Sequence, residues 1–184
     1  MEIKAALFCV ALSLVGLLVW RVLVRWCGLR SAPALLLCLS AAVCLALTVP
    51  QAVAYGAPAR LGQCLAHPAA DLTYSIRIFG TRGLEDLMNV LLWVPPGLFG
   101  VLATRRFWYV VGGISVTMIV VELLQTIDPG RECDPGDWVY NTVGGLIGAV
   151  LGTLLIFVYE RVRGRFRPTG RSGTAPPVRS GTVR

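Results

Sequence analysis

Three pairs of polar side chains interrupt the apolar runs of the chain at helical spacing. In chain order they are Asp86 with Asn89, Glu122 with Gln125, and Asp137 with Asn141. Residues three or four positions apart lie on one face of an α-helix. Carboxylates can transfer protons or hold cations, and amides both donate and accept hydrogen bonds. The pairs could therefore bind a polar ligand or take part in its reaction.

A polar loop over residues 128–136 separates the second pair from the third. It contains Arg131, the first expected partner of the Glu122 carboxylate, ahead of a proton shared with Gln125 or Asp137. A purely structural pair of Glu122 and Arg131 is the competing interpretation. The loop also contains Asp134, which with Asp137 could hold a hard cation, but so common a carboxylate pair does not predict a metal site.

Each pair also has a structural interpretation. Asp86 and Asp137 stand where acidic side chains cap a helix or stabilise its first turn. Asn89 and Asn141 would then bond to neighbouring helices. Glu122 fits this interpretation less well, because it lies in the last turns of its helix, where the helix dipole disfavours an anion.

The composition identifies the elements that must position these residues. Of the 184 residues, 55% are hydrophobic and 15% are charged, and the mean hydropathy is +0.69. Soluble domains carry about 25% charged residues, so a soluble enzyme, a disordered chain and a free nucleic-acid binder are excluded. Five apolar segments can cross about 30 Å of hydrocarbon. They run over Ala5–Trp26, Ala32–Ala54, Leu84–Thr104, Phe107–Ile127 and Trp138–Tyr159.

The sequence thus predicts an all-α integral membrane protein, a bundle of about five transmembrane helices forming one domain over residues 1–159. Residues 160–184 are predicted to be a disordered, Arg-rich cytoplasmic tail, because their composition cannot bury a core. In the last span Gly144, Gly148 and Gly152 recur every four residues. This spacing predicts a face that another helix can approach closely, and a homodimer through it is one expectation.

Positive charge predicts the orientation, because basic residues favour the cytoplasmic side of a membrane. The tail, Arg105 and Arg106 would lie there, with the N-terminus outside and the C-terminus inside a bacterial cell membrane. All three polar pairs then lie at one depth near the extracytoplasmic face. Cys64 and Cys133 would also lie outside, where an oxidising environment favours a disulfide between them.

Four stretches of the second half carry motifs in a fixed order. They are D-x-x-N followed by a tryptophan and P-P-G within 85–97, E-x-x-Q within 121–125, G-R-x-x-D-x-x-D over 130–137, and N-T-x-G over 141–144. Together they resemble the VanZ-like family of bacterial membrane proteins over about residues 84–157. The resemblance implies a multi-span membrane protein and, for some members, reduced susceptibility to teicoplanin, without an accepted reaction. Its polar motif positions coincide with the candidate polar site, namely Asp86, Asn89, Glu122, Gln125, Arg131, Asp134, Asp137 and Asn141.

Two classes of function follow from these residues. The leading hypothesis is a cell-envelope protein whose outer site binds a glycopeptide, a lipid-linked wall precursor or a partner protein, and so lowers susceptibility to teicoplanin. The alternative is a membrane enzyme acting on a lipid-linked envelope precursor. In that case Glu122 is the general acid or base, Asp134 and Asp137 hold a divalent cation and Arg131 contacts phosphate.

Membrane lipid is an expected partner under both hypotheses, and nucleic acid is not. No resident metal or cofactor is predicted, since the sequence has no zinc-ligand cluster, P-loop or dinucleotide-type glycine pattern. A transporter is disfavoured, because five spans without inverted repeats make a poor alternating-access scaffold unless the chain dimerises.

Overall fold

The computed structural model describes residues 2–49, 73, 77, 83–126 and 134–165 of the chain. Within these ranges there is no strand, and five α-helices have described bounds, while residues 73 and 77 are helical as well. The helices are α1 (Glu2–Cys27), α2 (Ser31–Thr48), α5 (Leu84–Thr104), α6 (Phe107–Gln125) and α7 (Pro135–Arg165). Each contains a stretch long and apolar enough to cross a membrane. The prediction of an all-α membrane bundle is confirmed.

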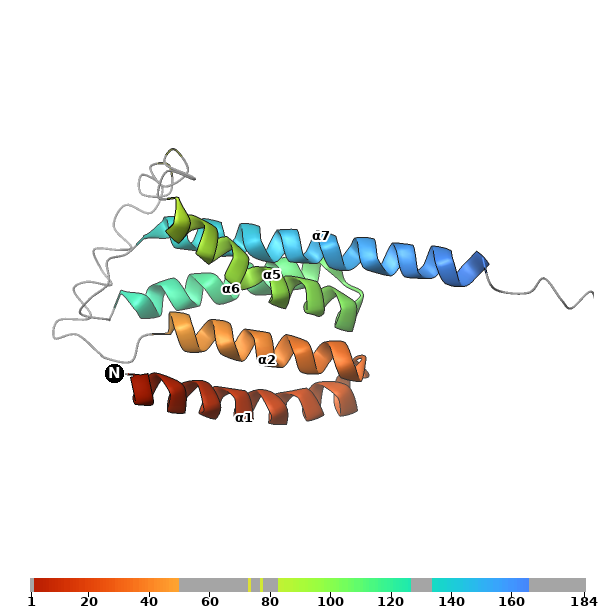
Figure 1. The fold of residues 1–184 in the computed structure, drawn as a ribbon, viewed down its shortest axis with the longest axis horizontal. Helices are drawn as coiled ribbons and strands as arrows, with labels where there is room; N and C mark the ends of the chain where they lie inside the picture. The colour runs from red at the N-terminus through yellow and green to blue at the C-terminus, as the bar shows by residue number, and fades with distance from the viewer. Residues whose placement is uncertain (1, 50–72, 74–76, 78–82, 127–133, 166–184) are drawn as a thin grey trace, which may run out of the picture.

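The helices lie side by side, and successive helices run in opposite directions (Figure 1). α1 packs against α2, α2 against α5, and both α5 and α6 against α7. The starts of α1, α5 and α7 therefore share one end of the bundle with the ends of α2 and α6. We call this the polar end, defined by Thr48, Asp86, Gln125 and Asp137. The opposite end is the arginine end, defined by Arg30, Arg105 and Arg106.

The predicted spans agree with the helices best in the middle of the chain. The third predicted span coincides with α5 at both bounds, whereas α2 ends at Thr48 and α6 at Gln125, each slightly earlier than expected. Residues 50–54 and Ile127 lie outside the described residues. α7 is longer than predicted at both ends. The expectation of a disordered tail from residue 160 is wrong for residues 160–165, which are helical, and residues 166–184 lie outside the described part.

Side-chain contacts accompany the extension of α7 beyond its apolar stretch. Glu160 forms an ion pair with Arg105, which follows the last residue of α5. One residue later, the guanidinium of Arg161 lies 5.0 Å from the centroid of the Phe157 ring, one helical turn away. Contacts between residues four apart stabilise a helix by about 0.2–0.5 kcal/mol each, so the helix continues where hydropathy alone predicts its end.

The contact between α5 and α7 is made by backbone. A Cβ atom at Gly144 would collide with the carbonyl oxygen of Val90, and one at Gly148 would collide with that of Val94. Gly152 lies against α5 as well. Small residues allow this close approach in membrane helix pairs. The predicted glycine face is thus occupied by α5 of the same chain, and a homodimer through these three glycines would need a surface that α5 already covers.

A cysteine of α2 compensates for a proline inside α5. Pro96 has no N–H, so the carbonyl oxygen of Leu92, four residues earlier, lacks its helical donor. The Sγ atom of Cys44 donates to that oxygen at a distance of 3.0 Å. Cys44 is buried and packs in the core with Trp93 and Met118. The thiol therefore ties α2 to α5 at the point where the backbone of α5 loses a hydrogen bond.

Candidate functional site

The start of α7 is capped by two side chains, one from the residue just before the helix and one from α6. The Oδ1 atom of Asp134 accepts the backbone N–H of Gly136 at 2.9 Å, which makes Asp134 the N-cap and Pro135 the first helical residue. The Oε1 atom of Glu122, on α6, accepts the backbone N–H of Asp134 at 2.7 Å. In a capping box, the side chain at the third helical position makes this second bond. Here a carboxylate from another helix makes it.

This contact accounts for a buried carboxylate near the end of α6. The side chain of Glu122 is only 8% exposed, and the C-terminal dipole of its own helix disfavours its charge. The positive N-terminal end of α7, however, faces the same carboxylate, and a hydrogen bond from a backbone N–H to an anion is stronger than a neutral one. Glu122 thus holds the start of α7 against the end of α6. Its expected partner, Arg131, lies outside the described residues.

Asp137 occupies the third helical position of α7 and bonds to α5. Its Oδ1 atom accepts a hydrogen bond from Nδ2 of Asn89 at 2.8 Å. The sequence assigned these two residues to different pairs, and the structure joins them across the α5–α7 contact. Asp86 stands one turn before Asn89, in the first turn of α5, and is 4% exposed. Asp86 and Asp137 are therefore both placed where a helix dipole stabilises negative charge.

Gln125 joins the end of α6 to the end of α2. Its Nε2 atom donates to the backbone carbonyl oxygen of Thr48 at 2.7 Å. The last carbonyls of a helix have no helical donor, so this bond satisfies one of them. Thr48 was not predicted as part of the site, because a backbone carbonyl at a helix end carries no residue-type signal.

Asn141 lies one turn after Asp137 on α7 and is 6% exposed. Its Oδ1 atom is buried and has no hydrogen-bond partner among the described residues. The same holds for Nε1 of Trp93 and Oγ1 of Thr142, two residues that the sequence did not single out as polar site residues. A buried polar atom left without a partner costs about 1–3 kcal/mol. Each such atom in a native structure needs an explanation, such as a bound water, ion or ligand.

The structure gathers most of the predicted site at the polar end. Its described members there are Asp86, Asn89, Glu122, Gln125, Asp134, Asp137 and Asn141, from α5, α6 and the start of α7. The predicted disulfide between Cys64 and Cys133 lies outside the described residues. Within the described ranges, no group of three or more His, Cys, Asp and Glu side chains is arranged to hold a metal ion. The charged members that are described are all acidic, so the arrangement offers acceptors to hydrogen-bond donors.

The comparisons agree with the motifs. The family model described as VanZ/LLP1 matches residues 50–157, which is more than half of the chain and includes every candidate site residue. No curated protein and no solved structure matches the chain. The resemblance drawn from the order of the motifs is confirmed, and this helical membrane protein belongs to the VanZ/LLP1 family.

Proposed function

We propose that the polar end binds the polar part of a cell-envelope ligand, and that this binding lowers susceptibility to glycopeptides such as teicoplanin. The ligand is a glycopeptide or a lipid-linked wall precursor. The polar end faces the outside of a bacterial cell, because Arg30, Arg105 and Arg106 mark the opposite end and basic residues favour the cytoplasmic side.

The buried acceptor of Asn141 carries this proposal. Its Oδ1 atom has no partner among the described residues, and it lies one turn from Asp137, which bonds to Asn89 across the helix contact. A hydroxyl or amide N–H of a ligand would satisfy this oxygen and remove the cost of burying it. Sugars and peptides both supply such donors, and glycopeptides and wall precursors contain both.

The charges at the polar end favour a ligand with donor groups over a phosphate. The described acidic side chains of α5, α6 and the start of α7 there are Glu85, Asp86, Glu122, Asp134 and Asp137. Like charges repel, most strongly where burial lowers the effective dielectric constant. We therefore assign the sugar and peptide groups of the ligand, rather than a phosphate, to this site.

A susceptibility test in a sensitive Gram-positive host examines the proposal. Empty vector, wild type and Asn141→Leu are compared at equal membrane abundance, with teicoplanin and vancomycin in parallel. Leucine has nearly the shape of asparagine and leaves no buried oxygen without a partner, so this variant should fold. Thr153→Val is the matched control, since Thr153 lies farther along α7 and its hydroxyl bonds to the carbonyl of Ala149 at 2.9 Å.

We expect wild type and Thr153→Val to raise the resistance of the host, and Asn141→Leu to behave as empty vector. The proposal is wrong if wild type gives no increase while present in the membrane. It also fails if Asn141→Leu protects as well as wild type.

The alternative function, an enzyme acting on a lipid-linked envelope precursor, requires Glu122 to transfer a proton. Glutamine retains an Oε1 atom that can accept the N–H of Asp134, but it cannot act as an acid or base. Under the binding proposal Glu122→Gln keeps the protective effect, whereas under the enzyme alternative it loses the effect. Glu122→Ala removes the acceptor and loses the effect in both cases.

A further inference from the structure

A groove runs between α2 and α6, with α5 beneath it. Its volume is about 350 Å³, within the range of about 300–1,000 Å³ usual for small-molecule sites. Trp93, Pro96 and Gly100 form its floor, spaced along one face of α5. Leu37 and Ala41 belong to its α2 wall. The lining is almost entirely apolar, so the groove suits a hydrocarbon chain.

The groove has the length of about one membrane leaflet. On α6 its lining residues extend from Tyr109 to Thr117, about 12 Å along the helix axis at about 1.5 Å per residue. Half of a hydrocarbon core of about 30 Å is about 15 Å. Toward the polar end, the bond from Gln125 to Thr48 ties its two walls together. The groove thus extends from the arginine end toward the middle of the bundle.

Two adjacent glycines of α6 differ in their position relative to the groove. Gly113 lines it, whereas Gly112 does not. A Cβ atom at either position would meet no atom within 4 Å. Gly113 therefore leaves the groove open where a larger side chain would fill it without disturbing the packing of the helices.

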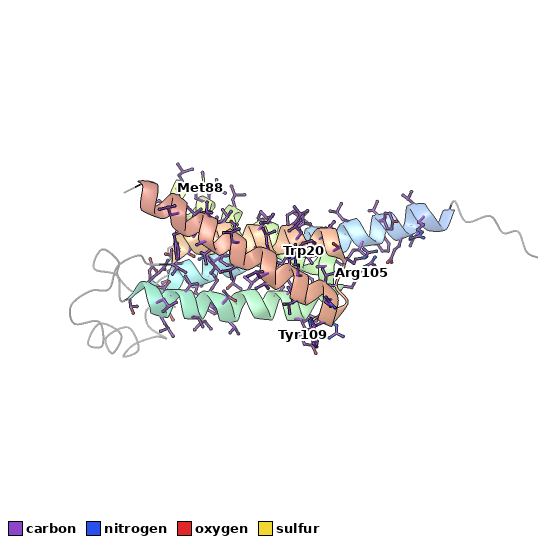
Figure 2. All side chains as sticks on the ribbon, turned by 90° about the horizontal axis from the view of Figure 1, so that it is seen from below. Trp20, Met88, Arg105 and Tyr109 are labelled. Atoms are coloured by element: carbon purple, nitrogen blue, oxygen red, sulfur yellow. The ribbon has the colours of Figure 1, made fainter. Side chains whose placement is uncertain are left out.

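A positively charged side chain lies at the arginine end of the groove. The guanidinium of Arg106 lies 5.3 Å from the ring centroid of Tyr109, a lining residue that is 75% exposed. Figure 2 shows Tyr109 and Arg105 at the same end of the bundle. Arg105 pairs with Glu160, whereas no carboxylate of the described residues lies within salt-bridge distance of Arg106. The charge of Arg106 is thus available beside an apolar groove.

We propose that this groove binds an acyl chain of an anionic phospholipid whose phosphate pairs with Arg106. Such a lipid needs a cation at the level of its headgroup and an apolar surface along its chain, and the two features adjoin here. Basic side chains attract anionic lipids in this way at the membrane surface. The site lies toward the opposite end of the bundle from the polar end, so it stands independently of the function proposed above.

The groove is tested with the two glycines. Full-length protein is reconstituted in vesicles of equal phosphatidylglycerol and phosphatidylcholine, extracted in mild detergent, and its bound lipid is counted by native mass spectrometry. Leucine at position 113 would displace two or three methylenes of the bound chain, and each buried methylene contributes about fourfold to affinity. We expect Gly113→Leu to retain at least about tenfold less phosphatidylglycerol than wild type, and Gly112→Leu to match wild type. Circular dichroism and thermal unfolding of both variants verify that they fold.

The headgroup contact is tested with two arginines that each lie over an aromatic ring. Arg106 lies over Tyr109 next to the groove, and Arg161 lies over Phe157 on the extension of α7. We expect Arg106→Gln to lower the preference for phosphatidylglycerol over phosphatidylcholine about fivefold. Arg161→Gln, with the same change of charge, should leave the preference unchanged.

Three results would overturn the proposal. The first is equal lipid retention by Gly113→Leu and Gly112→Leu, and the second is equal loss in Arg106→Gln and Arg161→Gln. The third is a dimer of the wild type that Gly113→Leu dissociates without a change in bound lipid, because it would assign the groove to a second copy of the chain.

Discussion

The carboxylate of Glu122 accepts the backbone N–H of Asp134 at 2.7 Å, so the end of α6 caps the start of α7. The two helices are joined at this point by a side chain as well as by the chain itself. The bond satisfies a donor at the start of a helix, where the first N–H groups have no helical acceptor. It also gives the buried charge of Glu122 a structural purpose, separate from any role in binding.

Replacing Glu122 should test that purpose. Glu122→Ala leaves the N–H of Asp134 without this acceptor, and we expect the free energy of unfolding to fall by about 1–3 kcal/mol. Glu122→Gln keeps an acceptor oxygen and should lose less than half as much. Equilibrium unfolding in mixed detergent micelles measures both values. Equal losses in the two variants would show that the charge, rather than the hydrogen bond, provides the stability.

The close contact between α5 and α7 predicts that the effect of a Gly→Ala substitution on stability depends strongly on its position. Gly148→Ala places a methyl group against the carbonyl oxygen of Val94, and such overpacking costs about 1–3 kcal/mol. Gly112→Ala meets no atom within 4 Å and should raise the stability by up to about 1 kcal/mol, because alanine favours a helix. The same unfolding measurement compares them. A neutral Gly148→Ala would mean that α5 and α7 can move apart freely.

The hydrogen bond from Asn89 to Asp137 should appear as a coupling energy. We expect a double-mutant cycle of Asn89→Ala and Asp137→Ala to give between about 0.6 and 1.7 kcal/mol, the range from the mean to the maximum measured between membrane helices. Asn89→Ala combined with Thr153→Ala is the reference pair, because Thr153 bonds within its own helix. Additive effects of Asn89 and Asp137 would contradict the contact.

The stability contributed by the hydrogen bond from Cys44 to the carbonyl of Leu92 should depend on Pro96. Cys44→Ala removes the donor and should cost about 1 kcal/mol, whereas Cys44→Ser keeps a donor. In a Pro96→Ala background, the new backbone N–H can bond to Leu92, so Cys44→Ala should cost less than in the native chain. Unfolding of the four chains of this cycle gives the difference. An unchanged cost in both backgrounds would separate the cysteine from the proline.

The orientation can be read from Cys27, which is exposed at the arginine end. A variant retains Cys27 while the other cysteines, Cys9, Cys38, Cys44, Cys64 and Cys133, are replaced by alanine. A membrane-impermeant maleimide should label it only after the cells are lysed, because the arginine end is expected in the cytoplasm. Labelling in intact cells would reverse the orientation and place the polar end inside.

Hydropathy predicted the positions of the helices better than it predicted their ends. α5 was predicted at both bounds because Gly83 and Arg105, which flank it, take positive φ angles of 64° and 60° that stop a helix where the apolar run also stops. α7 begins earlier than its apolar run because Asp134 and Pro135 form an N-cap and first turn. It ends later because Glu160 pairs with Arg105 at the end of α5 and Arg161 lies over the ring of Phe157. A hydropathy average counts Glu160 and Arg161 only as polar residues.

The sequence predicted which polar residues lie at one end of the bundle, but it did not predict their hydrogen-bond partners. Helical spacing and the positive-inside rule placed the polar pairs at one end of the bundle, and the structure gathers their residues there. The partners of Glu122 and Gln125, however, are a backbone N–H and a backbone carbonyl. Nearly every residue type carries these groups, so the sequence does not identify the partners. The bond between Asn89 and Asp137 depends on the register of α5 against α7, which the backbone contact at Gly144 and Gly148 sets.

The length of α7 determines how far its C-terminal end lies from the hydrocarbon core of a membrane. Its 31 residues measure about 45 Å at about 1.5 Å per residue, against about 30 Å for the hydrocarbon core. Up to about 15 Å of helix therefore projects beyond the hydrocarbon, and Figure 1 shows α7 continuing past the other helices at the arginine end. Because the projecting part is a continuous helix held at Arg105, it acts as a rigid spacer across the headgroup layer. Arg165, the last residue of α7, therefore lies at a set distance beyond the hydrocarbon core.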